Sequence, residues 1–259
     1  MPAEIKSRSE GRTLVLTLSN PAHRNALGPE IYAAGVEALS VAESSAEVRS
    51  VVIAGEGGIF SAGGNLQRLQ DNRRQPPAFQ AESIEGLHSW IEAIRAFPKP
   101  VIAAVEGAAA GAGFSLALAC DFVVAARGAI FVMAYSNVAL SPDGGGSWSL
   151  ARALPRQLVS ELVMCGERIS AERLHELGLV NRLTDAGDAL DEALALASNL
   201  NARAPNALAS IKELLNDADA NTFSRQLDAE RDHFVTNLHH ANAGIGIEAF
   251  LHKHKPQYE

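Results

Sequence analysis

Two glycine- and alanine-rich stretches decide the fold: Phe60-Ser-Ala-Gly-Gly-Asn-Leu66 and Glu106-Gly-Ala-Ala-Ala-Gly-Ala-Gly-Phe-Ser-Leu-Ala-Leu-Ala-Cys-Asp121. Each follows an apolar run typical of a strand, at 51–54 and 101–105, and each leads toward a predicted helix. Small side chains at a helix start leave unpaired backbone N–H groups open to close approach by a ligand. Brought together, two such loops direct two donors at one carbonyl oxygen, which is the geometry of an oxyanion hole.

Length and charge set the broad class. The chain has 259 residues, which suits one large domain or a domain with a helical appendage. Its net charge of −8 argues against nonspecific nucleic-acid binding. No apolar core follows the first residues, so they do not form a signal peptide, and Glu106 and Asp121 interrupt the apolar run 101–126. We therefore expect a cytoplasmic protein with no nucleic-acid or membrane partner.

The cysteines and the C-terminal histidines do not form a metal-binding pattern. Cys120 and Cys165 each follow an apolar residue and form no Cys-x-x-Cys pair, which predicts buried, reduced thiols and no zinc site. His252 and His254 alternate with lysines near the end of the chain, which is more typical of a solvated basic tail than of a metal site. No metal is expected.

The order of predicted elements is strand, helix, strand, helix, then helices alone. Residues 3–8 and 12–18 alternate around Glu10-Gly11 and predict a hairpin. The polar stretch 67–82 predicts a mobile surface loop, with a lid as one role. From about residue 186 the pattern is helical, which indicates an α/β core at 1–195 and a helical region at 196–259.

Several motifs, taken in order, resemble the crotonase, or enoyl-CoA hydratase/isomerase, family. They are Asn20-Pro21, Arg24-Asn25-Ala26-Leu27, the first glycine loop, Lys99–Gly107, Gly111-Ala-Gly113, Ala119-Cys-Asp121, Pro142-Asp-Gly-Gly-Gly146, Glu167–Ala171 and Gly246–Lys253. The resemblance implies an α/β spiral of ββα units with a C-terminal helical trimerisation module. It also implies an acyl-CoA thioester substrate, a homotrimer or dimer of trimers, and no cofactor beyond the coenzyme A of the substrate.

The resemblance also implies a set of site residues. By position, the thioester oxygen would lie between the N–H groups of Ala62 and Ala112, both small residues flanked by glycine. Arg24 and Lys253 would meet a CoA phosphate. The full set of implied substrate contacts is Arg24, Ala26, Leu27, Gly63, Gly64, Asn65, Leu66, Gly111, Ser115, Tyr135 and Lys253.

The chain departs from the hydratases of that family at two positions. Where they resemble one another in two glutamates that hold and activate water, this chain has Ser115 and Tyr135. Water addition needs a base for the water and an acid for the carbon. Asp143, in Ser141–Trp148, instead resembles the single carboxylate of family isomerases, including ring-epoxide-CoA isomerases. One carboxylate suffices to move a proton between two carbon atoms.

Several of these residues would also suit purely structural roles. Asp143 would also suit a cap for a helix at 144–153, although the catalytic role is preferred, and Asn65 would suit a helix N-cap. His88, Tyr135 and Trp148 would suit either an acyl pocket or the core. A dinucleotide fingerprint fails because Leu116 stands where its third glycine is needed.

The sequence thus favours isomerisation of a double bond or ring of an enoyl-CoA through an enolate, with Asp143 as the acid and base. One alternative is hydration, or hydrolysis of an oxepin-type ring, with Asp143 handling the water. A non-catalytic acyl-CoA binder is the alternative from another class.

Overall fold

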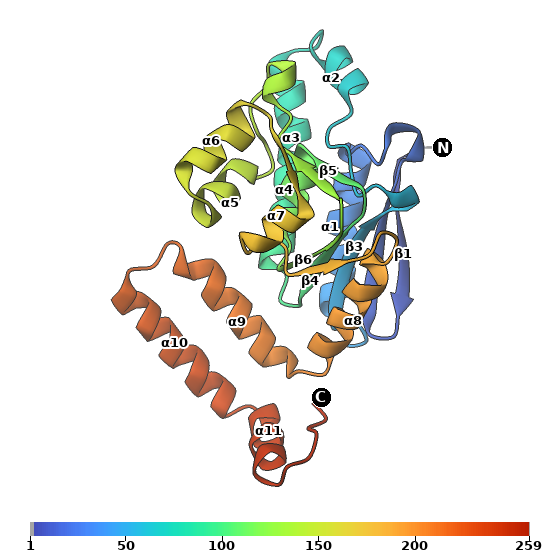
Figure 1. Ribbon diagram of the computed structural model, residues 1–259. Coiled ribbons are helices and arrows are strands. Elements are labelled where there is room, and N and C mark those ends of the chain that lie inside the picture. The colour runs from blue at the N-terminus through green and yellow to red at the C-terminus, as the bar shows by residue number, and fades with distance from the viewer. Residues whose placement is uncertain (1–2, 259) are drawn as a thin grey trace.

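The computed structural model describes residues 3–258 and shows a mixed α/β core from which a group of helices projects (Figure 1). The strands are β1 (Glu4–Glu10), β2 (Thr13–Ser19), β3 (Ser50–Gly55), β4 (Val101–Val105), β5 (Ala108–Ala110), β6 (Phe122–Ala126), β7 (Ile130–Val132), β8 (Arg168–Ser170) and β9 (Arg182–Thr184). The helices are α1 (Pro29–Ser44), α2 (Leu66–Asn72), α3 (Pro77–Ala96), α4 (Ala112–Ala119), α5 (Gly146–Ala153), α6 (Arg156–Met164), α7 (Ala171–Glu176), α8 (Ala189–Asn201), α9 (Pro205–Ala218), α10 (Phe223–Leu238) and α11 (Ala241–Leu251).

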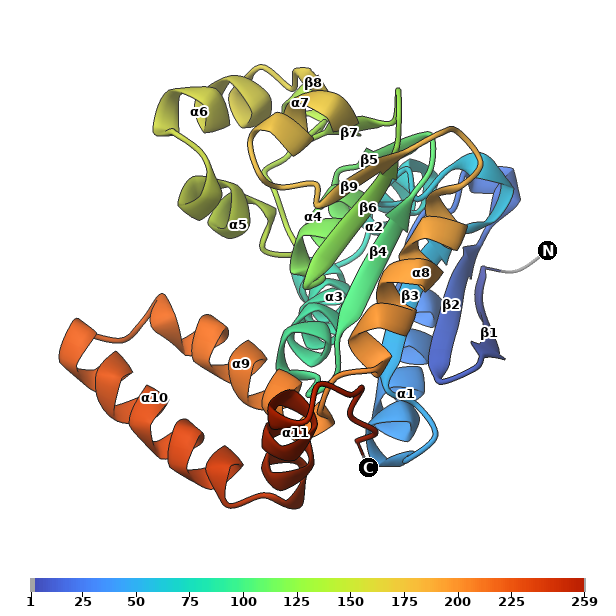
Figure 2. The ribbon, with the colours of Figure 1, turned by 60° about the horizontal axis from the view of Figure 1, so that its bottom comes forward.

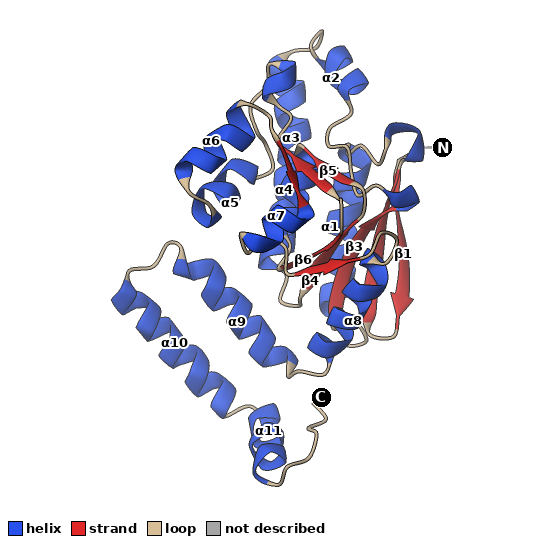
Figure 3. Ribbon diagram, in the orientation of Figure 1, coloured by secondary structure: helices blue, strands red, loops and turns tan. Residues whose placement is uncertain are grey.

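The main sheet has six strands in the order β1-β2-β3-β4-β6-β9. β1 and β2 form the predicted antiparallel hairpin, and every later pairing in this sheet is parallel. β3 and β4 are continuous apolar runs because both faces are covered. Val52 and Ile102 pack on one face beneath α8, while Val51 and Val101 pack on the other with α1 and α3. Figures 2 and 3 show the sheet between these helices.

A second, three-stranded sheet in the order β5-β7-β8 lies beside the main one. β5 and β7 are parallel, whereas β7 and β8 are antiparallel. β5 follows β4 after only two residues, so the chain leaves the main sheet and enters the second sheet just before α4. This change of sheet carries the second glycine loop away from the main sheet.

The predicted loop at 67–82 is wrong at both ends, which are helical, and holds only for the residues between the two helices. Residues 66–72 form α2, because the Asn65 side chain caps it by accepting the Arg68 N–H at 3.1 Å. α3 begins at Pro77, since proline at the first helical position has no N–H to leave unpaired. Only a short connection remains between the two helices.

The predicted boundary after residue 195 falls inside α8, whose Leu196 and Ala197 pack on the main sheet. The projecting group therefore begins with α9, and Figure 1 shows α9, α10 and α11 extending away from the core. α9 is anchored by Lys212, whose Nζ lies 2.8 Å from the Asp121 carboxylate.

Both cysteines are free thiols, but Cys165 is exposed, contrary to the prediction, because it follows the end of α6. Among residues 3–258, no helix combines the length and apolar character that crossing a membrane requires.

Candidate active site

The two glycine loops meet backbone to backbone, as the sequence predicts. The first loop runs parallel to β5: the Ser61 N–H donates to the Ala108 carbonyl at 3.1 Å, and the Ala110 N–H donates to Ser61 at 2.9 Å. At Gly63, φ is +84°, and a Cβ there would lie 2.5 Å from the Ala110 carbonyl oxygen. Glycine is therefore required at this crossing, both for its backbone conformation and for the close approach.

The structure corrects one of the two predicted oxyanion donors. The Ala62 N–H donates to the carbonyl of Arg24 at 3.0 Å, so this amide is already occupied. Two residues on, the N–H of Gly64 has no acceptor within residues 3–258. Ala112 is the first residue of α4, so its N–H likewise lies outside the helical bonding and has no acceptor in that range.

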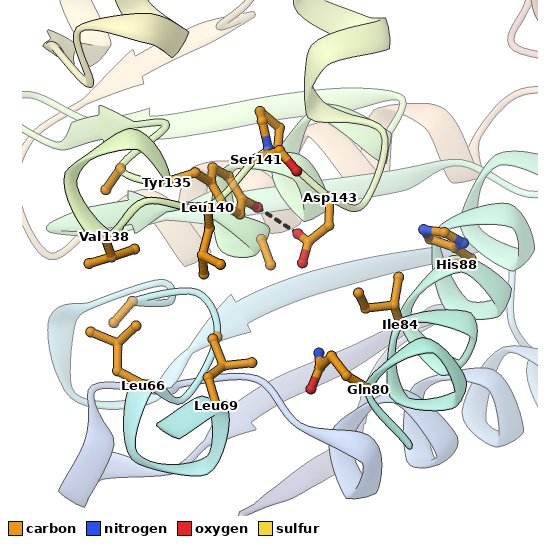
Figure 4. A pocket seen from close by; sticks show the side chains of 16 residues that line it. Leu66, Leu69, Gln80, Ile84, His88, Tyr135, Val138, Leu140, Ser141 and Asp143 are labelled. Carbon is orange, nitrogen blue, oxygen red and sulfur yellow. Dashed lines mark hydrogen bonds between the residues drawn. The ribbon is translucent and has the colours of Figure 1, made fainter. Parts of the chain in front are cut away.

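Gly64 and Ala112 both line a cavity of about 460 Å³. The wall of the cavity is mostly apolar and comes from α2, α3, the start of α4 and the segment before α5 (Figure 4). The lining residues are Ala62, Gly64, Leu66, Leu69, Gln80, Ile84, His88, Gly111, Ala112, Ala134, Tyr135, Val138, Leu140, Ser141, Pro142 and Asp143.

Asp143 points into this cavity, and it is the one carboxylate in the wall formed by the described residues (Figure 4). The Tyr135 hydroxyl donates to its Oδ1 at 2.6 Å. Burial raises the pKa of Asp143, while the Tyr135 hydrogen bond and the nearby His88 oppose that rise. Burial and the neighbouring Asp143 also raise the pKa of Tyr135, so its hydroxyl keeps its proton and remains a donor.

Asp143 does not cap the following helix, which contradicts the competing reading. α5 begins at Gly146, and its N-cap residue is Gly145, with no side-chain cap. Gly144 and Gly145 have φ of +59° and +77°, and the loop they form leaves the Asp143 side chain directed at the cavity. The carboxylate is therefore available for chemistry.

Ser115 lies behind the cavity wall and not in it. Its side chain is buried, and its Oγ donates to the Asp143 carbonyl at 2.9 Å. A Cβ at Gly146 would lie 2.5 Å from that Oγ, so the turn before α5 packs tightly against Ser115. Ser115 thus holds the backbone of Asp143, and no space remains there for a glutamate.

The other predicted site residues divide into three groups. Those in the cavity wall are Gly64, Leu66, Gly111 and Tyr135. Ala26, Leu27 and Gly63 lie outside the cavity wall and support the first glycine loop. The Leu27 N–H donates to the Gly63 carbonyl at 2.7 Å. Asn65 acts as the cap of α2.

The two predicted CoA-phosphate contacts differ in position. Arg24 has φ of +51° and is exposed next to the first loop, to which it is tied through its carbonyl. Lys253 follows α11, which lies at the opposite end of the molecule from α2 (Figure 1). Lys253 therefore does not reach a substrate in the cavity of its own chain.

Sequence reasoning correctly offered His88 as a pocket residue but misplaced Trp148. His88 lines the cavity, whereas Trp148 stacks between the guanidinium groups of Arg95 and Arg152, at 4.6 and 3.9 Å from its ring. Gln80 falls in the predicted loop 67–82, which hides its place on α3, and Ile84 lies just beyond that loop and has no polar group to single it out. Their four-residue spacing with His88 is the helical signal that would have found them.

Comparisons with known proteins show which family the chain belongs to. A model of the enoyl-CoA hydratase/isomerase family matches residues 8–259. The chain is 37% identical over 255 residues to 1,2-epoxyphenylacetyl-CoA isomerase of Escherichia coli K12, covering 98% of this chain and 97% of that protein. It is 35% identical to a probable enoyl-CoA hydratase of Bacillus subtilis, covering 95% and 94%.

The crystal structure of an enoyl-CoA hydratase from Polaromonas sp. JS666 superimposes with a TM-score of 0.98, at 74% identity, covering 99% of this chain and 100% of the other. The fold and the site thus define a crotonase-type enzyme. The chain belongs to the enoyl-CoA hydratase/isomerase family, whose members act on acyl-CoA thioesters, and the predicted fold class is confirmed.

Proposed function

We propose that the protein isomerises an unsaturated acyl-CoA, with Asp143 carrying a proton between two carbon atoms of the acyl group. The observation that carries this proposal is the single carboxylate in the cavity wall of the described chain, together with Ser115 and Tyr135 where hydration would need two carboxylates. The relative in Escherichia coli named as an isomerase supports it.

In this reaction the thioester oxygen lies between the amides of Gly64 and Ala112. The free oxygen of the Asp143 carboxylate removes a proton from the carbon next to the thioester, and the electron pair moves onto the thioester oxygen as an enolate. Two backbone donors stabilise this charge, and the N-terminus of α4 adds to them. The carboxylic acid then returns its proton two carbons further along, which shifts the double bond and restores the carboxylate.

The environment of Asp143 suits this task. Burial raises its pKa, so its carboxylate is a stronger base than an exposed aspartate. The hydrogen bond from Tyr135 to Oδ1 fixes the carboxylate in one orientation and leaves the other oxygen free. No metal or separate cofactor takes part in the proposed steps.

The test is to incubate the protein with 3-hexenoyl-CoA in deuterated water and to follow the products by mass spectrometry. Isomerisation gives 2-hexenoyl-CoA, which carries deuterium on carbon only to the extent that the Asp143 carboxyl proton exchanges with solvent before it is returned. Asp143→Asn should lower turnover by about 10²–10⁴ while leaving substrate binding intact. Asp185→Asn, on an exposed turn, is the matched control and should keep wild-type turnover.

Other outcomes decide for the alternatives. A mass gain of one water from 2-hexenoyl-CoA would replace isomerisation by hydration, the activity named for the Polaromonas relative. Binding with neither reaction on these or on ring-derived esters would indicate an acyl-CoA binder. Unchanged turnover in Asp143→Asn would remove this residue from the mechanism.

We propose, further, that the chain works in the cytoplasm as a homotrimer or a dimer of trimers. Large apolar side chains on the projecting helices support assembly: Phe223, Phe234 and Phe250 are 80%, 68% and 85% exposed. Analytical ultracentrifugation should give a mass of three or six chains, and a monomer at micromolar concentration would contradict the proposal. The free thiols Cys120 and Cys165 are compatible with a reducing compartment.

A further inference from the structure

α3 contributes two polar side chains, Gln80 and His88, to the side of the cavity away from Asp143. Figure 4 shows Gln80, Ile84 and His88 along α3, across the cavity from Tyr135 and Asp143. Residues four apart share one face of a helix, so all three side chains meet the same space. An acyl group in this cavity would lie between Asp143 on one side and His88 on the other.

Two polar side-chain groups of the wall already have hydrogen-bond partners that differ from the acyl group. The Tyr135 hydroxyl is bound to Asp143, and the Gln80 Oε1 accepts from Asn72 at 2.6 Å. Around His88, the Nδ1 lies 3.8 Å from the Glu85 Oε1, which is too long for a hydrogen bond. Within residues 3–258 the imidazole has no hydrogen-bond partner, and its side chain is 44% exposed.

An acyl group that enters the cavity covers this imidazole and displaces water from it. A hydrocarbon chain offers no replacement for the lost hydrogen bond, which costs about 1–3 kcal/mol for a fully buried group and less for a half-exposed one. An oxygen atom on the acyl group restores that bond. The wall therefore favours an oxygenated acyl group over a plain one.

The charges around the cavity select a neutral oxygen. No lysine or arginine is among the described lining residues, so a second carboxylate on the acyl group would have no cationic partner there besides a protonated histidine. Across the cavity, Asp143 would repel such an acid. A hydroxyl, a ketone or a ring ether meets neither difficulty.

We propose that His88 is a specificity-determining residue that hydrogen-bonds a neutral oxygen substituent on the acyl group, so that the enzyme prefers oxygenated acyl-CoA esters. The inference rests on the proposed function in one respect: it takes the acyl group to occupy this cavity.

Isothermal titration calorimetry tests the inference without relying on turnover. The probes are hexanoyl-CoA and four hydroxyhexanoyl-CoA esters, with the hydroxyl on the third, fourth, fifth or sixth carbon. The wild type should bind one of the four about tenfold more tightly than hexanoyl-CoA, which corresponds to about 1.4 kcal/mol. In His88→Phe this preference should fall to within about twofold, with hexanoyl-CoA bound as well as before or better.

The same substitution elsewhere serves as the control. His239, at the end of α10, is exposed and outside the cavity wall, so His239→Phe should keep the tenfold preference. A wild type without any preference, or a preference that survives in His88→Phe, overturns the inference. If His88→Phe binds no ester, the comparison is made with the smaller His88→Leu, and loss of hexanoyl-CoA binding there too also overturns it.

These results are separable from the fate of the proposed reaction. A wild type that prefers a hydroxyacyl ester yet leaves 3-hexenoyl-CoA unchanged in deuterated water would support the role of His88 and count against isomerisation. A wild type that shifts the double bond but shows no oxygen preference would do the opposite.

Discussion

The hydroxyl of Tyr135 donates a 2.6 Å hydrogen bond to Oδ1 of Asp143, and both side chains line the same cavity. The resemblance to the hydratases predicts a glutamate at this position, and the structure has a hydrogen-bond donor there in place of a second acid. A donor to a carboxylate favours its charged form and fixes its direction. This pairing suits an enzyme that uses one carboxylate as its base.

Tyr135→Phe should therefore change the pH dependence of the reaction. The Tyr135 hydrogen bond lowers the pKa of Asp143, so its loss raises that pKa further. Because the carboxylate form is the base, the acid limb of the kcat/KM profile should move to higher pH, and kcat at neutral pH should fall about tenfold.

The control is Tyr258→Phe, which removes a hydroxyl in the segment after α11, outside the cavity wall, and should leave the acid limb in place. If the acid limb of the kcat/KM profile is unchanged in Tyr135→Phe, or moves to lower pH, the role of Tyr135 as a hydrogen-bond donor to Asp143 is contradicted.

The role of the Gly64 N–H as an oxyanion donor can be tested by two small substitutions, one that removes the N–H and one that keeps it. Gly64→Pro removes the N–H and should lower turnover by about 10²–10³, the usual cost of one oxyanion donor. Gly64→Ala keeps the N–H, and its Cβ would make an ordinary 3.7 Å contact with Leu69, so turnover should stay within about threefold of wild type.

Steady-state kinetics, with thermal unfolding as a check on folding, measures both variants. A folded Gly64→Pro protein with normal turnover would mean that the thioester oxygen lies elsewhere.

Ser115→Glu should not convert the protein into a two-carboxylate hydratase. Ser115 is buried, and the turn at Gly144–Gly146 packs on it, so the longer, charged side chain should destabilise the fold by about 3 kcal/mol. Ser115→Ala removes the hydrogen bond to the Asp143 carbonyl and the longer contact with the Gly111 carbonyl, and it should cost about 1 kcal/mol. Urea unfolding measures both, and a stable Ser115→Glu protein that adds water to an enoyl-CoA would refute this view of the site.

Lys212→Met should loosen the anchor between α9 and the core. It leaves the Asp121 carboxylate without its cation and should cost about 3 kcal/mol, at the low end for buried pairs because the two side chains remain 10% and 22% exposed.

The deficit of Lys212→Met should shrink as the pH is lowered. Burial raises the pKa of Asp121 and Lys212 lowers it, so the variant's folded pKa lies further above the unfolded value. The folded variant then binds the extra proton between the two values, so its stability falls as pH rises through that window. Urea unfolding at several pH values measures this, and the double variant Asp121→Asn/Lys212→Met should recover part of the loss. A deficit that grows toward acid pH would contradict the assignment.

Much of the fold followed from local pattern. The alternation at 3–8 and 12–18 predicted the hairpin, and the apolar runs predicted β3 and β4. Both patterns involve only residues that are close in the sequence, so they can be recognised without the tertiary structure. The prediction of a loop at 67–82 was wrong at both ends, because polar residues are as common in exposed helices as in loops. The capping role of Asn65 was the local signal that favoured a helix there.

The candidate site was predictable in type but not in detail. The resemblance of the Ser141–Trp148 stretch to family isomerases indicated a single-carboxylate enzyme, and the glycine loops indicated backbone donors. Which amide is free depends on the Arg24 carbonyl, which binds the Ala62 N–H from a distant part of the chain. The carrier of the free N–H in the first loop is therefore Gly64, a choice no local pattern could make.

By itself, the sequence determined the strands, the two small-residue loops and the presence of one acidic side chain beside them, because these depend on side-chain size, polarity and spacing along the chain. Only the tertiary structure decided which backbone N–H groups stay unpaired, that Ser115 supports Asp143 from behind, and that His88 faces it across a cavity. Those features arise where segments far apart in sequence pack together, and each depends on hydrogen bonds and close contacts that exist only after the chain has folded.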